Sequence, residues 1–173
     1  MSKEPFMNPD YKPNENTRNE IEKMHKDGVS LSGINLKNAN MKNANLVNVD
    51  IPRADLTRSD FSGASMYGAN LEGANLFKAN FEGANLKSAN LQNCELLGTD
   101  FSNTKLNNVE WGKDYKVINE KEAEASLYKG DHEKACEKFK EAEDIYRTLK
   151  ISLKKHTIGE DVGKFFEREM IAR

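Results

Sequence analysis

The sequence predicts an all-β solenoid with helical segments on both sides of it, and two regularities carry this prediction. A large apolar residue recurs at every fifth position from Leu31 to Trp111, and a small residue, usually Ala, lies two places before most of them. On a helix, residues five apart would wander around the axis, and on one straight strand they would alternate between its two faces. A chain that turns a corner once per repeat keeps all of them inside.

We therefore expect the large residues of the repeat to form the core. They are Leu31, Leu36, Met41, Leu46, Ile51, Leu56, Phe61, Met66, Leu71, Leu76, Phe81, Leu86, Leu91, Leu96, Phe101, Leu106 and Trp111. Among them, the three Phe residues at 61, 81 and 101 are twenty positions apart. Four repeats per coil would stack these rings, so residues 31–111 are predicted to form about four coils and a column about 20 Å tall.

Most of the large residues follow an Asn or Asp. These side chains could form a hydrogen-bonding ladder that binds a partner, or they could bond to the backbone of the corners. The second interpretation is favoured, because Asn suits corner conformations. The glycines at positions 63, 68, 73 and 83 follow the same period and are expected in the corners.

The segments ANLEG, ANLFK, ANFEG, ANLKS and ANLQN, with ADLTR and SDFSG before them, resemble the A-(N/D)-L-x-x units of the pentapeptide repeat family. The resemblance covers about residues 31–111. It implies a right-handed quadrilateral β-helix with four repeats per coil. Near its end, Cys94, Thr104 and Val109 replace the usual Ala, which predicts a less regular last coil.

The N-terminal flank is predicted to hold an arm and a short helix. Residues 1–16 contain three prolines and little apolar content, which indicates a flexible arm. Residues 17–30 are predicted to form a capping helix, with Thr17 as N-cap, Glu20 three places later and Gly28 as the stop. A cap is expected because an open solenoid end exposes unpaired strand edges.

The C-terminal region, residues 112–173, is predicted to be helical. Expected helices run from Asn119 to Lys129, from Asp131 to about Lys155, and from about Glu160 onward, with a break at His156–Gly159. Lysines and glutamates alternate in NEKEAEA and KEAEDIY, a pattern typical of solvated helix faces. Three such helices can pack as a small bundle against the last coil.

Two further resemblances concern this region. The piece YKGDHEKACEKFKEAEDIY resembles one tetratricopeptide unit, although a single unit is more simply interpreted as a helical hairpin. The stretch from Ala142 to Arg173 resembles helical tails that follow pentapeptide repeats in archaeal and bacterial proteins, some of which lead into a membrane channel domain. This implies that the tail couples the column to something else.

The sequence shows no motif for catalysis, for a cofactor or for a metal. His25, His132 and His156 lie in separate regions, and Cys94 and Cys136 form no CxxC pair. No apolar run reaches the 18 residues or so of a membrane helix, and the first residues lack the apolar stretch of a signal peptide. We therefore expect a cytoplasmic protein without enzymatic activity, cofactor or direct membrane insertion.

These features predict a non-catalytic pentapeptide-repeat scaffold that mediates protein–protein interaction, as a monomer or a homodimer. One alternative implied by the resemblance is a DNA-mimicking protein that binds gyrase. It is disfavoured because residues 31–111 carry a formal charge of only -1, whereas duplex DNA carries one negative charge per roughly 1.7 Å. Another is a soluble relative of the cytoplasmic region of a pentapeptide-repeat membrane channel. No nucleic-acid partner is expected, and the sequence names neither the protein partner nor the face that binds it.

Overall fold

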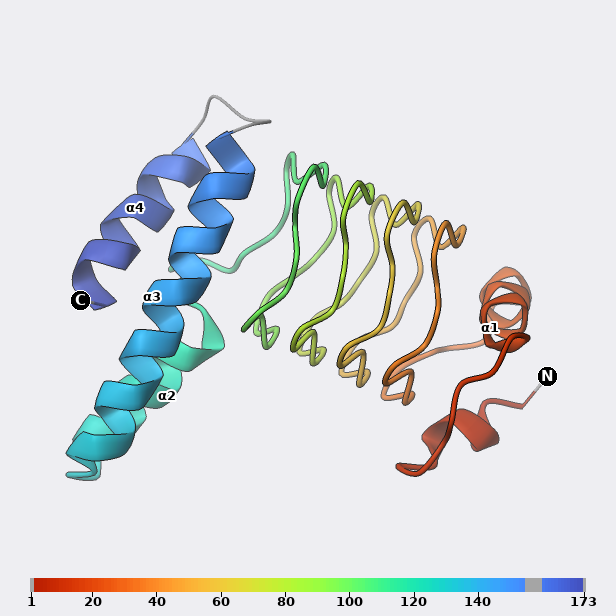
Figure 1. Ribbon diagram of the computed structural model, residues 1–173, viewed down its shortest axis with the longest axis horizontal. Coiled ribbons are helices and arrows are strands. Elements are labelled where there is room, and N and C mark those ends of the chain that lie inside the picture. The colour runs from red at the N-terminus through yellow and green to blue at the C-terminus, as the bar shows by residue number, and fades with distance from the viewer. Residues whose placement is uncertain (1, 155–159, 173) are drawn as a thin grey trace.

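The repeats form a four-sided column in which each coil takes twenty residues. The computed structural model describes residues 2–154 and 160–172, so the predicted break at His156–Gly159 lies outside it. Parallel β-bridges join residues twenty apart, from Asn35 with Asp55 to Asn90 with Glu110. The helices gather at the two ends of this column (Figure 1).

Four coils stack in register and give the column four faces. Face 1 carries Asn35, Asp55, Asn75 and Glu95; face 2 carries Asn40, Asp60, Asn80 and Asp100; face 3 carries Asn45, Ser65, Asn85 and Lys105; face 4 carries Asp50, Asn70, Asn90 and Glu110. Backbone bonds between the coils run along the column axis. Leu36 N, for example, donates to Asp55 O over 2.7 Å, and Asp55 N donates to Ile34 O over 2.9 Å.

The corners are tight turns, and most of them are closed by a backbone hydrogen bond. Ala39 N donates to Leu36 O over 2.9 Å, and between them Asn38 has a φ of 61°. A left-handed third residue with this bond is the geometry of a type II turn, which favours Gly and Asn. Residues with positive φ recur at every fifth position from Gly33 to Asn108, which explains the Gly and Asn found there.

The apolar centres fill the column. All seventeen, from Leu31 to Trp111, are buried, and none is more than 7% exposed. The Phe61 and Phe81 rings stack 5.2 Å apart, and the Phe81 and Phe101 rings 5.9 Å apart. The predicted stacking of the three rings is therefore confirmed.

The last coil keeps its register, although a less regular one was expected. Glu95, Asp100, Lys105 and Glu110 all form bridges to the coil before. The polar replacements for Ala donate to carbonyl oxygens inside the column: Cys94 Sγ to Leu71 O over 3.0 Å, Thr99 Oγ1 to Leu76 O over 2.8 Å and Thr104 Oγ1 to Phe81 O over 2.6 Å. Because each polar group is satisfied, burying it does not distort the coil.

The first sixteen residues, expected to be a flexible arm, pack against the first coil. A 3-10 helix, η1 (Glu4–Met7), buries Phe6 to 2% exposure. Asn35 N donates to Phe6 O over 2.6 Å, and Asn35 Nδ2 donates to Pro9 O over 2.8 Å. The arm is held because it supplies acceptors to the unpaired edge of the column and an aromatic ring to its core.

Helix α1 (Thr17–Lys26) lies over the same end of the column. Glu22 Oε1 accepts from Asn45 N over 2.7 Å, and Arg18 Nη1 donates to Lys42 O over 3.0 Å. Thr17 does not act as the predicted N-cap. Its hydroxyl accepts from Asn14 N instead, and the helix starts at Thr17 itself.

Three helices follow the column: α2 (Ile118–Tyr128), α3 (His132–Lys154) and α4 (Glu160–Ala172). Helix α2 begins one residue before the predicted Asn119, with Val117 as N-cap. Asp131 caps the start of α3 as predicted, because its Oδ1 accepts from Lys134 N over 3.1 Å. Helix α3 packs against both α2 and α4. The tetratricopeptide-like piece, residues 128–146, covers the turn between α2 and α3 and the first part of α3.

Aromatic packing joins these helices to the last coil. The Phe165 ring of α4 meets Trp111 edge to face at 5.2 Å between centroids and Tyr115 at 5.4 Å. Phe165 is 1% exposed. The far end of the column is therefore covered by rings, whereas the first end is covered by polar contacts as well as by Phe6.

Two carboxylates lie buried among the three helices, which corrects the expectation that the acidic residues of NEKEAEA are solvated. Glu120 of α2 accepts a hydrogen bond from the Tyr146 hydroxyl and one from Arg168 Nη1, the latter over 3.2 Å. Burial, and then the hydrogen bond to Glu120, raise the pKa of Tyr146 well above its usual value. Glu169 of α4, 2% exposed, pairs with Lys150 of α3. Charge pairing thus ties α4 to both other helices.

Candidate functional site

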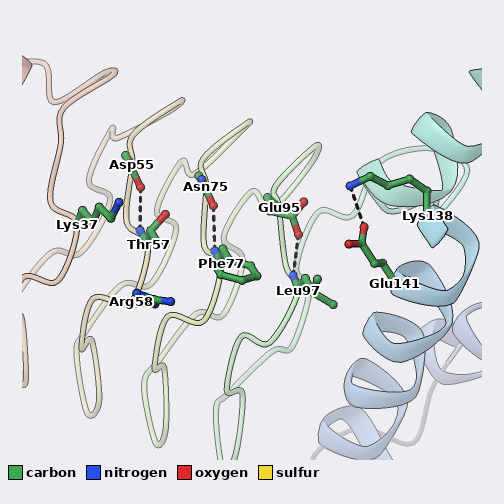
Figure 2. A pocket seen from close by; sticks show the side chains of 10 residues that line it. All are labelled: Lys37, Asp55, Thr57, Arg58, Asn75, Phe77, Glu95, Leu97, Lys138 and Glu141. Carbon is green, nitrogen blue, oxygen red and sulfur yellow. Dashed lines mark hydrogen bonds and ion pairs between the residues drawn. The ribbon is translucent and has the colours of Figure 1, made fainter. Parts of the chain in front are cut away.

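A groove of about 470 Å³ runs along face 1 and ends at helix α3 (Figure 2). We call it the face 1 groove. Its lining residues are Lys37, Asp55, Thr57, Arg58, Asn75, Phe77, Glu95, Leu97, Lys138 and Glu141. The first eight come from successive coils and form rows along the column, whereas the last two project from α3.

The acidic and amide groups of the groove are occupied by the backbone of the corners. Asp55 Oδ1 accepts from Thr57 N over 3.0 Å, and Asn75 Oδ1 accepts from Phe77 N over 3.0 Å. Glu95 Oε1 makes the same bond with Leu97 N over 2.8 Å. The interpretation that the residues before the centres bond to the corners is therefore confirmed on this face.

The basic residues of face 1 are not neutralised. Among the described residues, neither Lys37 nor Arg58 forms an ion pair, and both side chains are exposed. Lys78, beside the groove, places its Nζ 5.1 Å from the centroid of the Phe77 ring. Phe77 and Leu97 are half-buried and lie on neighbouring coils, so an apolar strip stands next to free positive charge.

Helix α3 closes the groove with an ion pair that is already satisfied. Lys138 Nζ lies 2.8 Å from Glu141 Oε2 and 3.2 Å from Glu122 Oε2. The hydrogen bond to Glu141 raises the pKa of Lys138 to about 12. Burial acts to raise the pKa of Glu141, but hydrogen bonds from Lys138 and Asn119 outweigh it and lower that pKa below 4.5. Both groups are charged at neutral pH, so neither is poised to exchange a proton there.

Asn119 fixes the position of α2 and α3 relative to face 1. Its Nδ2 donates to Glu141 Oε2 over 3.0 Å and to Glu95 Oε2 over 3.4 Å. One buried amide therefore links a column residue to the helical wall, so the groove has a defined width at this end.

Face 4 shows the ladder that the alternative interpretation expected. Asn70 Nδ2 donates to Asp50 Oδ1 over 2.8 Å, and Asn90 Nδ2 donates to Asn70 Oδ1 over 3.4 Å. These bonds join side chains of successive coils to one another. The ladder therefore strengthens the stacking of the coils and leaves fewer of its polar atoms for a partner.

Other polar groups of the described chain do not assemble into a reactive centre. Within residues 2–154 and 160–172, no three His, Cys, Asp or Glu side chains gather in a way that could hold a metal ion. Burial raises the pKa of the Cys94 thiol to about 12, which makes it a poor nucleophile. Among the helices of the described residues, none is long and apolar enough to cross a membrane.

Sequence reasoning named the seventeen core residues, which the structure places inside the column, but it named no binding residue. The groove residues were missed because they fill the variable positions of the repeat. One signal was present: Lys37, Thr57, Phe77 and Leu97 share the position after the centre and lie twenty residues apart. Reading each such position coil by coil would have placed them in one row.

Three overlapping segments, 27–63, 54–93 and 84–110, match the family model described as pentapeptide repeats, in eight copies. No curated protein is similar enough to the chain to match it.

Several solved structures, pentapeptide repeat proteins among them, match about half of the chain. The protein alr5209 from Nostoc PCC 7120 is 25% identical, with a TM-score of 0.37, and the match covers 54% of this chain and 76% of that one. Rfr23 from the cyanobacterium Cyanothece 51142 is 38% identical, with a TM-score of 0.27, over 47% of this chain and 59% of that one. QnrB1, a plasmid-mediated fluoroquinolone resistance protein, is 18% identical, with a TM-score of 0.21, over 46% and 53%.

Proposed function

Because residues 27–110 belong to the pentapeptide repeat family, we propose that this protein is a non-catalytic scaffold that binds another protein along the face 1 groove. The observation that carries the proposal is the groove itself, where unpaired cations and half-buried apolar side chains of the column meet helix α3. The column holds side chains at regular spacing along the groove, and α3 bounds the groove at one end. Such a surface suits recognition of a chain that lies along it.

The interior of the column supports a structural role. Its core consists of stacked apolar residues, and its buried hydroxyl and thiol groups donate to carbonyl oxygens. The only acid–base pair in the groove, Lys138 with Glu141, stays charged at neutral pH. These features fit a rigid spacer better than an enzyme.

The remaining expectations belong to the same proposal. From the family resemblance we infer that the coils wind in a right-handed sense. Helix α1 and the arm on one side, and α2 to α4 on the other, serve as caps; Asn45 N and Lys42 O, both edge groups of the first coil, are paired by α1. The free cysteines Cys94 and Cys136 suit the cytoplasm. A monomer or homodimer remains the proposed state.

The charge pattern speaks against a DNA mimic. Face 2 carries Asp60, Glu82 and Asp100 with Lys42, a net charge of -2, whereas face 3 carries Lys87 and Lys105 and no acid. Acidic and basic faces alternate around the column. A duplex presents phosphates all the way round, so we do not propose gyrase binding, nor a nucleic-acid partner.

Site-specific crosslinking tests the proposal. A photoreactive amino acid replaces Lys78, beside the face 1 groove, or Glu82, on face 2, in the full chain within its native cells. We expect one protein to be captured from position 78 and not from 82, and the same protein, once purified, to bind the full chain in calorimetry. Equal capture from both positions, or a captured protein that fails to bind when purified, would refute the proposal.

A further inference from the structure

We infer that the face 1 groove recognises an extended acidic segment of its partner that carries a bulky apolar side chain about three residues away from its carboxylates. This inference rests on the proposed function and adds the chemistry of the bound segment. It follows from three features of the groove: the cations that form no ion pair, the position of the apolar strip, and the distance between these cations and the strip.

On face 1, Lys37 and Arg58 form no ion pair among the described residues, whereas each carboxylate accepts a hydrogen bond from the backbone. One carboxylate oxygen of Asp55 and one of Glu95 accept a hydrogen bond from a backbone N–H of their own corner. The other oxygen of Glu95 accepts one from the Asn119 amide. Lys37 and Arg58 have no such partner among the described residues. An incoming carboxylate therefore finds two cations ready to pair, and Arg58 can bind it with two parallel hydrogen bonds.

The apolar strip lies between these cations and α3. Figure 2 shows Lys37 at the open end, Thr57 and Arg58 on the next coil, then Phe77, then Leu97 beside Lys138 and Glu141. Phe77 and Leu97 are half-buried, so a large side chain laid against them would remove apolar surface on both partners from water. The order of the rows gives the bound segment a direction, with its acidic end away from α3.

The spacing sets the length of the segment. Successive coils are about 4.8 Å apart, so Arg58 and Leu97 are separated by about 10 Å, and Lys37 and Leu97 by about 14 Å. An extended chain rises about 3.3 Å per residue. The distance between Arg58 and Leu97 is therefore spanned by about three residues of an extended peptide, and the distance between Lys37 and Leu97 by about four or five.

A nucleic-acid strand fits this groove less well than an acidic peptide. A strand carries a phosphate at every nucleotide, and phosphates laid along the groove would come close to Asp55 and Glu95, which also line it. An acidic peptide can place its charges only at Lys37 and Arg58 and pass neutral residues over the carboxylates. Like charges held close together are destabilising, so the peptide is favoured.

Peptide binding to the full chain tests this inference. The probe is a fluorescent six-residue peptide with two glutamates, two serines, a leucine and a final serine, measured by fluorescence anisotropy at low and physiological salt. We expect saturable binding that weakens with salt. We also expect it to fall at least fivefold when leucine becomes serine, or when lysines replace the glutamates.

Matched variants locate the site. Lys37→Glu and Arg58→Glu should each weaken binding by about tenfold, whereas Lys42→Glu and Arg53→Glu, at the same repeat positions on faces 2 and 4, should change it by less than about twofold. Phe77→Ser should weaken it by about fivefold, and Tyr67→Ser on face 3 should not. Unchanged circular dichroism melting curves would show that each variant is folded.

Three outcomes would overturn the inference. One is the absence of peptide binding at about 1 mM, another is equal weakening by the face 1 variants and their controls, and a third is tighter binding of a six-nucleotide single strand. The crosslinking at position 78 remains independent of these results. A partner captured there that lacks an acidic segment would keep the scaffold role and refute only the chemistry assigned to its ligand.

Discussion

The column and the three-helix unit differ in the kinds of side chain that they bury. The column buries apolar centres in register, and the Cys94 thiol and the Thr99 hydroxyl, buried among them, donate to carbonyl oxygens of the coil before. The three-helix unit buries two carboxylates, Glu120 and Glu169, against Arg168 and Lys150. The difference teaches that the inside of the column accepts different apolar side chains and small neutral polar ones, whereas the helices depend on individual partner residues.

The largest effect should come from placing a charge inside the column. Phe81→Asp removes the middle ring of the Phe61–Phe81–Phe101 stack and buries a carboxylate without a partner. We expect a loss of at least about 5 kcal/mol in the free energy of unfolding, enough to collapse the column. Thermal melting followed by circular dichroism measures it. Phe81→Leu, which keeps the site apolar, should still fold, and a Phe81→Asp variant with an unchanged midpoint would show that residue 81 does not face inward.

A smaller loss should follow when a carboxylate is removed from the helices. Glu120→Ala leaves the Tyr146 hydroxyl without its acceptor and Arg168 without its counter-charge, so we expect a loss of about 3 kcal/mol. Urea unfolding followed by the fluorescence of Trp111, which packs on Phe165 of α4, reports it. Glu124→Ala, on the exposed side of α2, is the control and should cost less than about 1 kcal/mol. Equal losses would mean that Glu120 has no special part in the packing.

The ion pair at the end of the groove should make a modest, pH-dependent contribution. The pKa of Glu141 is lower in the folded chain than its usual 4.5, so its contribution is present above pH 4.5 and is lost as the pH falls through the lowered value. We expect the free energy of unfolding of the wild type to exceed that of Glu141→Gln by up to about 1 kcal/mol at pH 7 and by less at pH 3. The comparison needs melting curves of both proteins at both pH values, and a gap that widens toward pH 3 would contradict the assigned direction.

The smallest effect should come from the outside of the column. Glu82 is exposed on face 2, and its backbone N–H, rather than its side chain, forms the hydrogen bond to Asn80 Oδ1. Glu82→Lys should therefore change the free energy of unfolding by no more than about 0.5 kcal/mol. A larger change in the urea midpoint would show that the outer charges of the column contribute to its stability.

The sequence could predict the column because nearly every repeat has the same kinds of residue at the same positions. Leu36 and Phe81 occupy the same position, and the spacing of the three Phe residues set the coil length without any knowledge of contacts. The corner bonds of Asn75 and its equivalents followed from the chemistry of one side chain and its own backbone.

The helices and the arm could not be predicted in the same detail, because their environment is set by residues far away in the chain. Glu120 looks solvated in its own helix, and only Tyr146 and Arg168, from two other helices, show that it is buried. Phe6 lies among prolines and polar residues, so nothing nearby marks it as part of the core. The face 1 groove likewise depends on how Asn119 sets α3 against Glu95.

The bonds that join one coil to the next have a mechanical consequence. They run along the column axis, and the two termini lie at opposite ends of the molecule (Figure 1), so a pull on the termini loads the coils in sequence and peels them one by one. Each released coil of twenty residues would lengthen the chain by about 60 Å. Optical tweezers should therefore record a staircase of equal steps, one for each released coil.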